Sequence, residues 1–75
     1  MAMQLTGTLE HVDLEGGTWF LETREERWVL LGPIPHHLNR RVVVVEGEVV
    51  ESMGFHMAGP QLHVGTIKAA GTAAV

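Results

Sequence analysis

The sequence predicts a small all-β protein, a five-stranded barrel with one short helical turn between its third and fourth strands. Three observations predict this fold. Short segments of alternating apolar and polar residues recur along the chain, glycines interrupt the longest of these segments, and turn-forming residues separate them. The chain has 75 residues, of which 45% are hydrophobic, so it can build one small core but not a second domain.

The first predicted strand covers residues 3–11. Its odd positions Met3, Leu5 and Leu9 alternate with polar residues, which is the pattern of a strand with one buried face. Gly7 falls on the same inward face. A glycine inside a strand is typical of a bulge or of a bend where a barrel strand curves, and we expect one of these at Gly7.

Two short strands follow, at residues 18–23 and 27–31, and the polar residues 24–26 form a tight turn between them. The second of these strands ends at the pair Gly32-Pro33. Pro35 suits the first position of a helical turn, and we expect a single turn at about residues 35–39.

The strongest strand in the sequence is 41–51, and a last strand at 61–68 follows a return segment that starts at 55–57. The predicted inward residues of these strands are Val43, Val45, Val49, Leu62, Val64 and Ile67. Gly65 is expected to form a bulge that shifts the register. The barrel is thus predicted to span residues 3–68, with a flexible tail at 69–75.

Glycines and valines at particular places give the chain a family resemblance. The segments that carry it are 5–10, 28–32, 43–49 and 59–64. They resemble small stand-alone bacterial OB-fold proteins of unassigned function, over about residues 4–68. The resemblance implies an OB barrel, in which the second and third strands usually form the binding face. An SH3-like barrel is the alternative, although its helical turn usually precedes the last strand.

Catalytic groups are scarce. The chain has no cysteine and no tyrosine, and its one serine, Ser52, lies in a predicted turn. The paired carboxylates at 25–26 and at Glu46 and Glu48 are expected on exposed surface, where nothing shifts a pKa for acid/base work. We therefore expect the chain not to be an enzyme.

The chain has five histidines, and they raise the question of a metal. Neighbouring side chains at 36 and 37 point apart, and no helical spacing completes a tetrahedral site. Met53, His56 and Met57 have the ligand chemistry that favours Cu(I), and they are similar to the sites of small OB-fold copper and silver chaperones. However, strand alternation puts the thioethers opposite the imidazole, so we expect core packing, no cofactor and metal-independent folding. Whether the histidines meet in space stays open.

The leading function hypothesis is a non-catalytic binding module that uses the second and third strands with the loops at 13–17 and 52–54. Its expected contacts are Phe20, Arg27 and Val29, which supply apolar area and one charged donor, whereas both tryptophans are expected in the core. The alternative is a single-stranded nucleic-acid binder. The net charge of −4 opposes it, unless the four arginines form a local basic patch.

Location and self-association complete the expectations. No signal peptide or apolar membrane span is visible, so a cytoplasmic protein without membrane contact is expected. Val42, Val44 and Val50 share the outer face of their strand with two glutamates. A contiguous apolar patch of this kind is typical of a protein–protein contact surface. We expect either that a homo-oligomer buries this face or that the helical turn packs over it.

Overall fold

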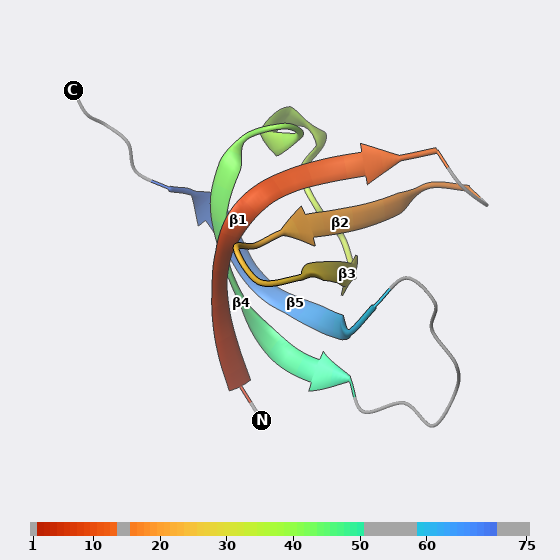
Figure 1. The fold of residues 1–75 in the computed structure, drawn as a ribbon. Helices are drawn as coiled ribbons and strands as arrows, with labels where there is room; N and C mark the ends of the chain where they lie inside the picture. The colour runs from red at the N-terminus through yellow and green to blue at the C-terminus, as the bar shows by residue number, and fades with distance from the viewer. Residues whose placement is uncertain (1, 14–15, 51–58, 71–75) are drawn as a thin grey trace.

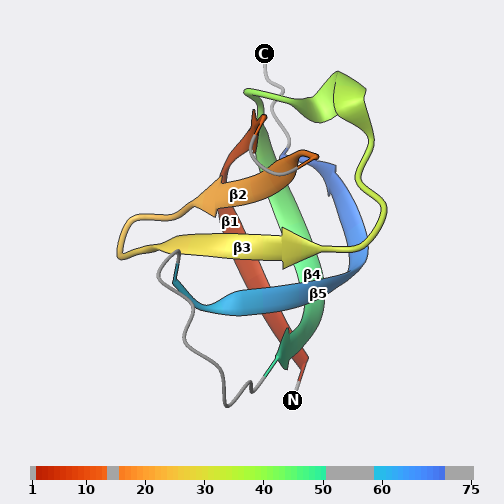
Figure 2. The same ribbon diagram turned by 90° about the vertical axis from the view of Figure 1, so that its right-hand side faces the viewer.

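Five strands close into a barrel in the order β1-β2-β3-β5-β4 in the computed structural model, as Figures 1 and 2 show. The structure describes residues 2–13, 16–50 and 59–70. Within these residues the elements are β1 Ala2–Val12, β2 Thr18–Glu22, β3 Arg27–Leu31, the 3-10 turn η1 His36–Leu38, β4 Val42–Val50 and β5 Gln61–Ala69. The expected return segment at 55–57 lies outside the described residues.

The strand pairing is that of the predicted OB-like barrel. The long strand β1 pairs with β4 through its first half and with β2 through its second half, and it curves strongly between them (Figure 1). The pair β3–β5 is parallel and all other pairs are antiparallel. Because η1 lies between β3 and β4, the SH3-like alternative, which has its turn before the last strand, does not apply.

Alternating residues from all five strands form the core. The buried cluster consists of Leu9, Leu21, Trp28, Leu30, Ile34, Leu38, Val43, Val45, Leu62 and Val64, with Leu5, Trp19, Val49 and Ile67 packed against it. The inward faces predicted for the first, fourth and fifth strands are therefore confirmed, with one exception. Met3 is 39% exposed, so its predicted place in the core is wrong. β1 pairs with β2 only from Thr8 onward. Met3 therefore has no β2 residue beside it to cover its side chain.

A bulge in β5 bends the barrel at the predicted glycine. Glu46 pairs with Thr66 and Gly47 pairs with Val64, so Gly65 is the extra residue and the predicted bulge is confirmed. At Gly47 the two strands come so close that a Cβ would overlap the carbonyl oxygen of His63. Gly7 has the same role in β1, where a Cβ would overlap the carbonyl oxygen of Glu22. Both strands can therefore cross their neighbours closely only because these residues are glycines.

The turn η1 covers one end of the barrel rather than its outer face. Leu38 of η1 and Ile34 just before it belong to the core cluster, while Val42 stays 52% exposed. The expected turn at 35–39 is confirmed, but the idea that it covers the outer valines is wrong. Arg40, at φ 71°, turns the chain into β4 and donates its backbone N–H to the carbonyl of Leu9 at 2.7 Å.

Candidate binding surfaces

The outer face of β2 and β3 contains the residues expected to bind a ligand. Phe20 is the register partner of Val29, and both alternate with core residues along their strands. The two side chains thus lie on the predicted face. They are nevertheless only 4% and 7% exposed and do not belong to the core cluster. Both side chains are thus largely covered in this structure, and their contact with a ligand stays a prediction.

Arg27 contributes to this cover. Its guanidinium carbon lies 4.3 Å from the centroid of the Phe20 ring, a cation-π contact, and the residue itself is exposed. Arg27 is the register partner of Glu22, but the structure gives it no ion pair with a carboxylate of the described residues. The planar guanidinium therefore lies against the ring beneath it.

The turn that joins β2 to β3 is held by a threonine. The Thr23 hydroxyl donates to the carbonyl of Glu26 at 2.7 Å and accepts from the backbone N–H groups of Glu25 and Glu26 at 3.3 and 3.2 Å. Three glutamates and two arginines gather along residues 22–27, so this end of the predicted surface has no excess of positive charge. The other two arginines, at 40 and 41, follow η1.

The loop at 13–17 is described only in part, because residues 14–15 lie outside the described residues. The loop at 52–54 lies outside them altogether. Ser52 also lies outside the described residues, and so do the residues of the copper hypothesis, Met53, His56 and Met57. Their expected roles stay predictions.

Three rings meet at the barrel end that η1 covers. The ring centroids of His11 and Trp19 are 4.6 Å apart, and that of His36 lies 5.1 Å from each of them. The backbone N–H of His11 also donates to Oδ1 of Asn39 at 3.1 Å, which ties β1 to the residue after η1. Sequence reasoning missed this group because its members come from three elements. Trp28 lies in the core as expected, but Trp19 is only partly buried.

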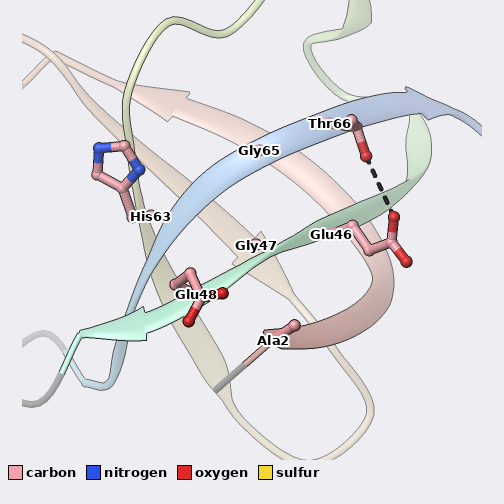
Figure 3. A pocket seen from close by; sticks show the side chains of 7 residues that line it. All are labelled: Ala2, Glu46, Gly47, Glu48, His63, Gly65 and Thr66. Carbon is pink, nitrogen blue, oxygen red and sulfur yellow. Dashed lines mark hydrogen bonds between the residues drawn. The ribbon is translucent and has the colours of Figure 1, made fainter.

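A shallow depression of about 270 Å³ lies on the outer face of β4 and β5 (Figure 3). Ala2, Glu46, Gly47, Glu48, His63, Gly65 and Thr66 line it. The Thr66 hydroxyl donates to Oε1 of Glu46 at 3.5 Å, and His63 projects at the opposite end of the depression. Its acidic and imidazole groups are thus spread over an open surface. Within residues 2–13, 16–50 and 59–70, no three His, Asp or Glu side chains come together as a metal site.

Comparisons with protein-family models, curated proteins and solved structures found no match for this chain. The resemblance to small bacterial OB-fold proteins therefore stays an expectation from the sequence. In the described part of the chain, no helix is long and apolar enough to cross a membrane.

Proposed function

We propose that the chain is a non-catalytic binding module whose recognition surface is the outer face of β2 and β3. The observation that supports this proposal is the stacking of the exposed Arg27 guanidinium on Phe20, 4.3 Å from the ring centroid. Phe20 and Val29 form an apolar base, and Arg27 is the contact group. A guanidinium stacked on a ring loses less conformational entropy on binding than a free side chain does.

The proposed partner is a protein segment or a small ligand with a planar acceptor such as a carboxylate, because a guanidinium fork matches that shape. Glu22 is the register partner of Arg27 and repels a ligand with several negative charges. The proposed ligand therefore has a single carboxylate rather than a strongly anionic group. The cytoplasm is the proposed place of action, in line with the expectation from the sequence.

A peptide selection tests the proposal. A random peptide library is selected on the immobilised chain, with counter-selection on Arg27→Gln. Backbone amide shifts of the 15N-labelled chain then map where the enriched peptides bind. The proposal expects shifts along β2 and β3 and an affinity at least about tenfold lower for Arg27→Gln, since hydrogen bonds to a charged group contribute about 1.5–3 kcal/mol. Peptides that bind Arg27→Gln equally well, or that shift only other strands, overturn it. Arg24→Gln is the matched control.

Single-stranded nucleic-acid binding is the second candidate, supported by the OB-like strand order alone. The three glutamates along residues 22–27 oppose it, because a stacking surface for nucleic acid normally lies in a cationic groove. Fluorescence anisotropy with labelled single-stranded DNA and RNA at low salt separates the two candidates. Tight binding that weakens steeply with added salt favours the nucleic-acid function.

A further inference from the structure

The ring group of His11, Trp19 and His36 brings two imidazoles together from distant parts of the chain. His11 belongs to β1 and His36 to η1, and their ring centroids are 5.1 Å apart. Trp19 at the start of β2 contacts both rings. The indole thus supports each imidazole from one side, and the core cluster supports the indole. Such support limits the orientations that the two imidazoles adopt.

The imidazole of His11 has no hydrogen-bond partner among the described residues. The hydrogen bond that holds this residue to η1 comes from its backbone N–H, which donates to Oδ1 of Asn39. Its Nε2 lies toward Gly17, where an added Cβ would come within 2.7 Å, so the backbone of Gly17 occupies that side of the ring. A side chain at residue 17 would clash with this ring, so the close contact needs a glycine, and Nδ1 is the nitrogen that we assign to a ligand. The backbone φ of 109° at Gly17 also disfavours any other residue there.

The separation of the two rings suits a shared ion. Zinc binds imidazole nitrogen at about 2.0–2.1 Å, and two imidazoles on one tetrahedral ion then have ring centres about 5 Å apart. His11 and His36 already have this separation. A shared ion then requires that both side chains turn so that one nitrogen of each ring points to it.

We propose that His11 and His36 form a two-imidazole site for a divalent transition-metal ion such as Zn(II), with water at the remaining positions. Neutral imidazole is a preferred ligand of such ions. This site shares no residue with the Met53, His56 and Met57 set of the copper hypothesis. The barrel closes through its strands and core without these two side chains, so the ion binds the folded chain and is not needed to form it.

The test uses the untagged full chain and Zn(II). Calorimetric titration measures stoichiometry and affinity for the wild type and for His11→Phe and His36→Phe, which keep an aromatic ring against Trp19. His37→Phe and His63→Phe are matched controls, because both residues are exposed histidines outside the ring group. Long-range 1H–15N spectra of the wild type identify the imidazoles whose nitrogens shift when Zn(II) is added. Thermal unfolding checks that each variant is folded.

The proposal expects one ion per chain, an affinity at least about tenfold lower in each of His11→Phe and His36→Phe, and near-wild-type affinity in the controls. The imidazole signals of His11 and His36 should shift together. No heat of binding at millimolar Zn(II) overturns it, and so does binding that survives in either ring variant. If a ring variant is unfolded, the wild-type spectra decide, and shifts confined to His37 or His63 overturn the proposal.

Discussion

Gly47 lies against the backbone of His63, so close that any Cβ at position 47 would overlap the carbonyl oxygen of that residue. The obstacle is main chain and cannot rotate away. We predict that Gly47→Ala destabilises the barrel by about 1–3 kcal/mol or more, measured by chemical denaturation. Gly65→Ala is the control, because its Cβ would lie 3.3 Å from the carbonyl oxygen of Glu46, a tight contact that a small shift relieves. Equal losses in the two variants would contradict the close crossing of β4 and β5.

Leu21 and Val42 should respond in opposite ways to truncation. Leu21 is fully buried in the core cluster, whereas Val42 is 52% exposed. We expect Leu21→Ala to cost about 2–5 kcal/mol of unfolding free energy through lost burial and a new cavity. Val42→Ala should change it by no more than about 0.5 kcal/mol. Thermal and denaturant unfolding measure both values, and a tolerated Leu21→Ala would count against the described core.

The contact between Arg27 and Phe20 can be measured by a double-mutant cycle. Arg27→Gln and Phe20→Leu are made singly and together, and the coupling free energy of unfolding is expected to be about 0.5–1 kcal/mol, the usual value of an exposed cation-π pair. The same cycle with Arg24→Gln should give a coupling close to zero. A coupling of zero for Arg27 would show that the ring does not hold the guanidinium in solution.

The outer valines lead to a prediction of self-association. Val42 stays exposed, and Val44 and Val50 are partly exposed on the same face of β4. We expect sedimentation equilibrium at micromolar concentration to show a dimer, because burying an exposed apolar patch against a second copy lowers the free energy of the pair. Val42→Glu should return the chain to a single 8.2 kDa species. A wild-type chain that sediments only at 8.2 kDa would remove the idea.

Chelation should leave the fold intact. The chain has no cysteine, and the core is built from apolar side chains of all five strands. We predict that EDTA does not change the melting temperature of the untagged chain. Added Zn(II) should raise it, since a ligand that binds only the native state stabilises that state. A fall in melting temperature with EDTA would show instead that a metal supports the fold.

Strand identity and the bulge were predictable from local patterns. Alternation located all five described strands to within about two residues, and the glycine at 65 predicted the register shift, because a glycine within a strand commonly marks a bulge. The register of pairing was not predictable in the same way. The exposure of Met3 depends on where β2 stops beside β1, which is a relation between segments rather than a property of either one.

The candidate sites were harder to predict, for a related reason. Alternation identified the side of the sheet on which Phe20 lies, but not the Arg27 side chain above it. The contact of His11 with His36 forms only when η1 folds back over the end of the barrel. The position of that end depends on how the five strands close into the barrel. The sequence shows five histidines. It has no local signal for which two of them meet.

The place of β5 between β3 and β4 also determines when the molecule can fold. Every pair on that side of the ring, including the parallel pair with β3, waits for β5, which comes after the other four described strands in the chain. The nascent chain therefore carries β3 and β4 with open edges until synthesis of β5 is complete, and a fold dominated by such distant pairings forms slowly. Until β5 pairs with both edges, these edges are where another chain can add a strand, so this is the stage at which the molecule is most exposed to aggregation.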